Sequence, residues 1–223
     1  MRHPRWTAAC IVVAFALAAC AAHGTEVSVT RSALQHGDPD AAPEFAALPD
    51  VQATQQTPRV VRGLSLARDV LQHGLPTPPD DRRYAALQAW IDRAVVPWVE
   101  SRRDSLDETR YQFGIPAGAE PKPAAGSEPE SAIAWGVLAL LEENTARELS
   151  RIPSPTELDT EPDIADIFRE LVGKQARPFR SAALAKYRKC YDLGVHAGSE
   201  VADWAQFCGL RYERVHRELH DGS

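Results

Sequence analysis

Apolar residues recur at steps of three and four along most of the chain after residue 58, and this spacing predicts helices. The recurring positions are Val60, Leu64, Ala67 and Leu71; Tyr84, Leu87, Ile91, Ala94 and Trp98; Ile133, Val137, Leu140 and Leu141; Ile164, Ile167, Phe168 and Leu171; Phe179, Ala183, Tyr187 and Cys190; and Val201, Trp204, Cys208, Val215 and Leu219. No segment alternates apolar and polar residues convincingly enough to predict a strand. We therefore expect an all-α fold built from helical hairpins or an irregular helical bundle.

Prolines, glycines and capping residues predict where these helices begin and end. Pro97 interrupts the second apolar stripe, which predicts a kink or a new helix with the proline in its first turn. Gly114 is expected to end that helix. The sequence Ser127-Glu128-Pro129-Glu130 fits a capping box that opens the next helix. Thr160 is expected to cap the helix after that, and another helix is expected beyond Pro178.

Changes in composition divide the chain into five segments. These are a signal peptide (1–19), a lipidated N-terminus with a disordered tether (20–58), a helical segment (59–114), a linker or loop (115–128) and a helical domain (129–223). The tether is rich in Pro, Asp and Ala, a composition that favours a flexible or extended chain. Pro, Ala and Gly also dominate the second break, which we interpret as an internal linker or loop.

The first 19 residues have the pattern of a secretory signal. A short start that carries Arg2 and Arg5 precedes about a dozen apolar residues, and small residues then follow up to Cys20. The apolar run is too short to predict a helix that spans the bilayer. We therefore expect these residues to be removed during export.

The end of this run, Leu17-Ala18-Ala19-Cys20, resembles the lipobox of bacterial lipoproteins. The resemblance implies cleavage before Cys20 and a diacylglycerol on its thiol, so that acyl chains hold the mature chain at the membrane. Ala21 and Ala22 stand where many inner-membrane lipoproteins carry an aspartate, which implies an outer-membrane anchor facing the periplasm. A signal peptide cut elsewhere, with Cys20 incidental, is the alternative.

Charge narrows the choice of partners. Removing residues 1–19 leaves 23 basic residues against 31 acidic ones, a net charge of −8. Such a surface is a poor partner for nucleic acid or anionic lipid headgroups. The expected partners are therefore the membrane, through the lipid anchor, and another protein of the cell envelope.

The C-terminal part carries a second, weaker resemblance. Ala183, Tyr187 and Cys190 have the spacing of the small-aromatic-small pattern that closes a tetratricopeptide-type hairpin, and Gly194 and a helix with Trp204 follow. The similarity covers residues 178–219 without a second copy at a period of 34. It implies a helical hairpin of that general type.

Cys190 and Cys208 are the cysteines that remain once Cys20 is lipidated, and an exported compartment favours a disulfide between them. Two buried thiols are the alternative. The segment from Gly194 to Gly198 is the expected loop, whereas symmetric pairing of the cysteines would place the turn near Ser199. This offset strains the Cα separation that a disulfide allows, so the pairing is a test of the predicted loop.

His216 and His220 lie four residues apart on the predicted last helix, with Glu213 and Asp221 close in sequence. Two imidazoles and a carboxylate could bind Zn²⁺. No third firm ligand is identifiable, so we interpret these residues as a solvated C-terminal face and expect no metal or cofactor.

No sequence pattern points to catalysis. The chain has no Gly-Xaa-Ser-Xaa-Gly elbow, no Gly-rich phosphate loop and no Cys-Xaa-Xaa-Cys. We interpret Glu142 and Glu143 as charges on a solvated helix face, because neighbouring residues on a helix point apart. The sequence therefore favours a non-catalytic envelope lipoprotein that binds or scaffolds other proteins. The alternatives are a periplasmic ligand- or metal-binding protein and an envelope hydrolase with no recognisable motif.

Overall fold

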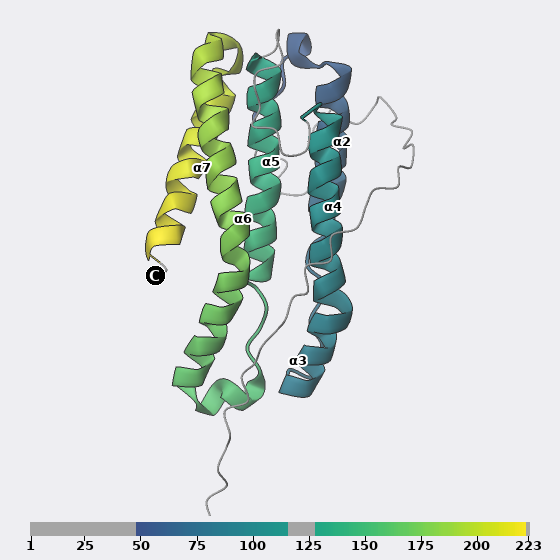
Figure 1. The fold of residues 1–223 in the computed structure, drawn as a ribbon, viewed down its shortest axis with the longest axis vertical. Coiled ribbons are helices and arrows are strands. Elements are labelled where there is room, and N and C mark those ends of the chain that lie inside the picture. Colours follow the sequence, from purple (N-terminus) through teal and green to yellow (C-terminus); the bar gives the residue numbers. More distant parts are fainter. Residues whose placement is uncertain (1–47, 116–127, 222–223) are drawn as a thin grey trace, which may run out of the picture.

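A computed structural model describes residues 48–115 and 128–221 of the chain (Figure 1). The predicted signal peptide, Cys20, most of the predicted tether and Ser127 of the capping box lie outside these ranges. The described residues form helices and contain no strand. The all-α prediction is therefore confirmed.

Five long helices and several short helical segments follow one another within the described residues. They are η1 (Ala53–Gln55), α2 (Pro58–Gln72), α3 (Tyr84–Trp90), the π-helix η2 (Ile91–Val95), α4 (Val96–Gln112), α5 (Glu128–Leu149), η3 (Thr156–Thr160), α6 (Pro162–Ala197), η4 (Gly198–Val201) and α7 (Ala202–Asp221). The central helix is α5, which contacts α2 and α4 on one side and α6 and α7 on the other (Figure 1). Helices α6 and α7 form a hairpin.

The core surrounds α5. Every residue from Ala132 to Ala146 is buried, as expected for a helix that is covered by neighbours on all sides. The larger apolar cluster joins this helix to α2, α4, α6 and α7, and includes Val60, Leu106, Tyr187 and Trp204. A smaller cluster lies where the end of α5 meets α4 and the middle of α6; its buried members are Val95, Val99, Ala146, Leu149, Ala176 and Phe179.

The predicted break at Pro97 is confirmed. Pro97 lies in the first turn of α4, and the preceding turn is a π-helix in which the amide of Val96 donates to the carbonyl of Ile91, five residues back. Proline has no amide proton to donate, and the first turn of a helix tolerates this. The predicted end at Gly114 is also confirmed, because this residue has a φ of 76° just after α4.

The predicted break at Pro178 is wrong. Helix α6 runs through the proline as one element of 36 residues, about 54 Å long at 1.5 Å per residue. Ala176 and Phe179, on either side of the proline, are both buried against the smaller core. Packing on both sides outweighs the backbone hydrogen bond that an internal proline removes. Thr160 does not cap α6 either; the N-cap is Glu161, and its side chain makes no capping bond.

The predicted loop at Gly194 is also wrong. Gly194 lies inside α6, and the turn of the hairpin begins at Gly198, which has a φ of 77°. A Cβ atom on Gly194 would lie 2.9 Å from the Cβ and 3.2 Å from the Cα of Ala205 on α7. The glycine therefore permits a close approach of two helices and does not mark a chain reversal.

We expect Gly194→Ala to lower the free energy of unfolding by about 1 to 3 kcal/mol, because the new methyl group would push α7 away from α6. Gly173→Ala is the matched control, since it lies on the same helix with no atom within 4 Å of the added methyl. It should stabilise the protein by about 0.5 to 1 kcal/mol through lower chain entropy. Urea unfolding followed by circular dichroism measures both. Equal effects of the two variants would contradict the close contact.

Candidate functional site

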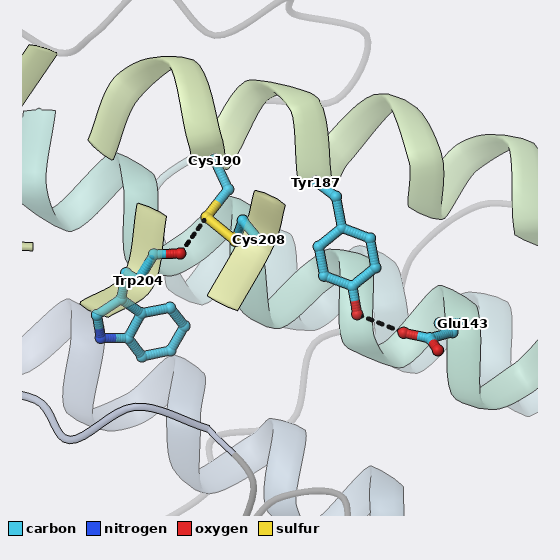
Figure 2. The surroundings of a disulfide bond; sticks show 5 residues. All are labelled: Glu143, Tyr187, Cys190, Trp204 and Cys208. Atoms are coloured by element: carbon cyan, nitrogen blue, oxygen red, sulfur yellow. Dashed lines mark hydrogen bonds between the residues drawn. A yellow bond between two sulfur atoms is a disulfide. The ribbon is translucent and has the colours of Figure 1, made fainter. Parts of the chain in front are cut away.

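Cys190 of α6 and Cys208 of α7 form a disulfide with a Cα separation of 6.0 Å (Figure 2). The pairing works because the hairpin turns at Gly198–Val201, which places its centre near Ser199 and makes the two cysteines symmetric about it. The offset expected from a loop at Gly194 therefore does not exist. The predicted disulfide is present in the structure.

Glycine also allows this hairpin to lie directly on α5. A Cβ atom on Gly136 would be 3.0 Å from two ring carbons of Trp204 and 3.1 Å from the sulfur of Cys208. Trp204 is buried, and its ring meets Phe207 edge-on at 6.0 Å between ring centroids. The disulfide thus lies within the core between three helices and is not exposed to a partner.

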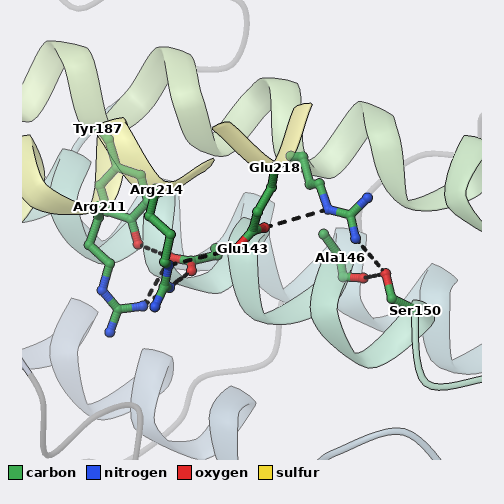
Figure 3. Close-up of polar contacts among 8 residues, drawn as sticks. Glu143, Ala146, Ser150, Tyr187, Arg211, Arg214 and Glu218 are labelled. Atoms are coloured by element: carbon green, nitrogen blue, oxygen red, sulfur yellow. Dashed lines mark hydrogen bonds and ion pairs between the residues drawn. The ribbon is translucent and has the colours of Figure 1, made fainter. Parts of the chain in front are cut away.

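A buried carboxylate ties α5 to the same hairpin (Figure 3). Tyr187 of α6 donates its hydroxyl hydrogen to Oε2 of Glu143 at 2.6 Å, and Nη1 of Arg211 on α7 lies 3.1 Å from the same oxygen. Arg214, one turn later on α7, pairs with the other carboxylate oxygen. Burial raises the pKa of the Tyr187 phenol, which keeps it a neutral donor.

Glu142 points to a different partner. Its Oε1 lies 2.8 Å from Nζ of Lys186 on α6. Burial raises the pKa of Glu142, while the nearby ammonium of Lys186 acts in the opposite direction. The interpretation of Glu142 and Glu143 as a solvated face is wrong, because both are buried. The two carboxylates do take separate partners, as adjacent helix positions predict.

We expect the stability of the wild type, relative to Glu142→Gln, to increase as the pH falls from neutral toward 4.5. The folded state holds the proton of Glu142 more tightly than the unfolded state does, because its pKa is raised from the usual 4.5. Its contribution is therefore most favourable at low pH and is lost as the pH rises through the folded-state pKa. Urea unfolding of both proteins across this range measures the difference. A difference that is constant or runs the other way would contradict the raised pKa.

Further hydrogen bonds and one ion pair join the ends of helices to their neighbours. The carbonyl of His73, at the end of α2, accepts hydrogen bonds from Trp98 at 3.1 Å and from Arg102 at 2.6 Å. On the opposite side of α5, Arg180 donates to the hydroxyl of Ser150 at 2.7 Å and lies 3.9 Å from Glu218 of α7. The polar groups named in these paragraphs are thus engaged in holding the bundle together.

The predicted metal candidates, His216 and His220, lie side by side on α7. Their rings stack at 4.2 Å between centroids, and Tyr212 lies next to His216 at 5.9 Å. Within residues 48–115 and 128–220, no group of three or more His, Cys, Asp or Glu side chains is arranged to hold a metal ion. The structure therefore brings the two predicted histidines together on one helix face, and a metal centre would need at least one further ligand.

An exposed apolar surface lies at the beginning of α6. Ile164, Ile167 and Leu171 are 46%, 55% and 37% exposed, and their spacing places them on one side of the helix. We call these three residues the α6 stripe. This part of α6 extends beyond the end of α5, so the central helix does not cover it (Figure 1). The sequence predicted an apolar helix face here but gave no sign that the face is exposed.

The charged residues at the two ends of the α6 stripe differ in sign. Asp163 and Asp166 are exposed near the beginning of the helix, while Lys174 and Arg177 are exposed about two to three turns later. Between them, Arg169 pairs with Asp166, and Lys174 lies 2.7 Å from Glu170. The stripe therefore runs from an acidic end to a basic end.

The segment before α6, η3, contacts α6 and is itself bound to α3. The carboxylate of Glu157 in η3 accepts a hydrogen bond from the backbone amide of Tyr84 at 3.0 Å, and this bond joins η3 to the first turn of α3. The amide of Thr156 donates to the carbonyl of Arg82 at 3.0 Å. Ala165, on the side of α6 away from the stripe, is buried. The stripe is thus presented by a helix whose other side is packed.

No protein-family model matches this chain, and no curated protein or solved structure is similar enough to count as a match. None of the helices in the described part of the chain combines the length and the apolar composition needed to cross a bilayer.

Proposed function

We propose that this chain is a lipid-anchored protein of the cell envelope that binds or scaffolds other proteins without catalysing a reaction. The anchor is Cys20, at the end of the lipobox-like sequence, and the membrane is the outer one, facing the periplasm. The observation that carries the binding role is the exposed α6 stripe. Eight large apolar side chains are exposed in the described part of the chain, and three of them lie within the eight-residue span 164–171.

Physical chemistry supports this interpretation of the α6 stripe. Burying an exposed Ile or Leu side chain contributes about 1.5 to 3 kcal/mol, so a surface that leaves three together gains from a partner that covers them. Exposed apolar patches bordered by charges are typical of protein interaction sites. The buried carboxylates Glu142 and Glu143, by contrast, are already bound by side chains of their own chain, which supports a structural role for them.

The binding role is tested by affinity purification from chemically cross-linked envelopes. The native protein is compared with Ile167→Glu, which places a charge in the α6 stripe, and with Leu210→Glu on α7 as a matched control at another exposed apolar residue. We expect a stoichiometric protein to be recovered with the native protein and with Leu210→Glu, but to be lost with Ile167→Glu. Recovery that Ile167→Glu leaves unchanged would count against the stripe.

The anchor is tested separately with Cys20→Ser. Labelling cells with a fatty acid analogue should mark the native protein and leave Cys20→Ser unlabelled, and separation of the two membranes should place the labelled form in the outer one. Equal labelling of both proteins would overturn the lipobox interpretation. A soluble native protein would do the same.

A further inference from the structure

We infer that the partner of the α6 stripe is the same stripe of a second copy, packed antiparallel across a twofold axis near Phe168 and Arg169. This inference rests on the proposed function only in taking the α6 stripe as a protein-binding surface, and it names the protein bound there as a second copy of the chain. A symmetric dimer is the commonest form of self-association, and it requires a surface that is complementary to itself. The distribution of charge along the stripe meets this requirement.

The two ends of the stripe match when one helix is reversed. Asp163 and Lys174 lie 11 residues apart, about three turns of helix, and therefore lie on the same side of α6. They are equally far from the proposed axis. In an antiparallel pair, Asp163 of each copy faces Lys174 of the other, with Arg177 one turn further along. A parallel pair would instead place Asp163 beside Asp163, where like charges repel.

The middle of the stripe supplies the apolar contact. Ile167 and Leu171 lie on opposite sides of the axis, so the Ile167 of one copy packs near the Leu171 of the other. The charges beside them are balanced within each helix, because Asp166 pairs with Arg169 and Glu170 with Lys174. Such exposed pairs contribute only about 0.3 to 0.5 kcal/mol. Because its pair with Glu170 is this weak, Lys174 can also interact with Asp163 of the second copy.

The expected dimer is weak in solution. Three apolar side chains per copy form a contact smaller than that of a standard stable interface. We expect a dissociation constant on the order of 10 μM. Attachment to one membrane raises the effective concentration of the two copies and would favour the dimer there without further contacts.

Sedimentation equilibrium of the full chain carrying Cys20→Ser, from about 1 to about 200 μM, spans this constant. We expect a monomer–dimer equilibrium. Ile167→Glu should weaken the dimer at least about tenfold, equivalent to about 1.4 kcal/mol, while Leu210→Glu should leave it unchanged. Circular dichroism confirms that each variant remains folded.

Charge exchange tests the antiparallel arrangement. Asp163→Lys and Lys174→Asp should each weaken the dimer about threefold or more, because each places like charges opposite one another in both symmetric contacts. The double variant restores opposite charges and should return the dissociation constant to near that of the parent. A dimer that Ile167→Glu leaves intact, or a double variant no tighter than the single ones, would overturn the inference.

The test of self-association and the test of the proposed function can give different results. A monomer at every concentration, together with an envelope protein captured through Ile167, would refute self-pairing and leave the binding role standing. A dimer lost with Ile167→Glu would support self-pairing even if no other protein is captured. A monomer with no capture would refute both.

Discussion

Replacing Glu143 by alanine is expected to lower the free energy of unfolding by about 3 to 5 kcal/mol, because it leaves buried cationic and hydroxyl groups without their shared acceptor. Glu143 accepts the hydroxyl of Tyr187 at 2.6 Å and lies 3.1 Å from the guanidinium of Arg211. These partners come from α6 and α7, so the loss loosens both from α5. Equilibrium unfolding in urea, followed by circular dichroism, measures the change.

The control is Glu213→Ala on α7, where the carboxylate is exposed. It should change the free energy of unfolding by no more than about 0.5 kcal/mol. Glu143→Gln should fall between the two, because an amide oxygen still accepts from Tyr187 but carries no charge for Arg211. If Glu143→Ala lowers the free energy of unfolding no more than Glu213→Ala does, then the contacts of Glu143 do not hold the three helices together.

Loss of the disulfide, in the variant Cys190→Ala with Cys208→Ala, is expected to lower the free energy of unfolding by about 3 kcal/mol. The two cysteines are separated by 18 residues in the sequence, and a cross-link over such a loop restricts the unfolded chain by about this amount. Unfolding in urea with and without a reductant measures the effect on the wild type.

The double alanine variant provides the control for the reductant. A reductant should lower the stability of the wild type toward that of the variant and leave the variant itself unchanged. Thiol titration of the unfolded, unreduced wild type should find neither Cys190 nor Cys208 free. Two reactive thiols at these positions would contradict the disulfide.

Regular elements were predictable wherever the periodicity of apolar residues was undisturbed. The stripes from Val60 to Leu71 and from Ile133 to Leu141 became α2 and α5. Pro178 and Gly194 misled the prediction, because both are local signals of a helix end. Buried neighbours on both sides hold the helix together at Pro178, and the close approach of Ala205 explains the glycine. Tertiary contacts decided both cases, and a local pattern does not contain them.

The candidate site was less predictable for the same reason. Glu142 and Glu143 have the composition of a solvated face, and their burial depends on Lys186 and Arg211, which lie 44 and 68 residues later in the chain. The α6 stripe has the spacing of any helix that packs on a core, so its exposure follows only from where α5 ends. The cysteine pair, by contrast, required only a count of cysteines and an exported compartment.

The proline within α6 has a further consequence for how the helix opens. Pro178 removes one bond from the backbone ladder close to the point where α6 leaves the core. We expect amides before this gap, along the stripe, to open by local fraying at a small fraction of the global free energy of unfolding. We expect amides after it, in the disulfide-linked hairpin, to open only with larger parts of the fold. One continuous helix would then carry two cooperative units, and a partner that covers the stripe would stabilise the first without rearranging the second.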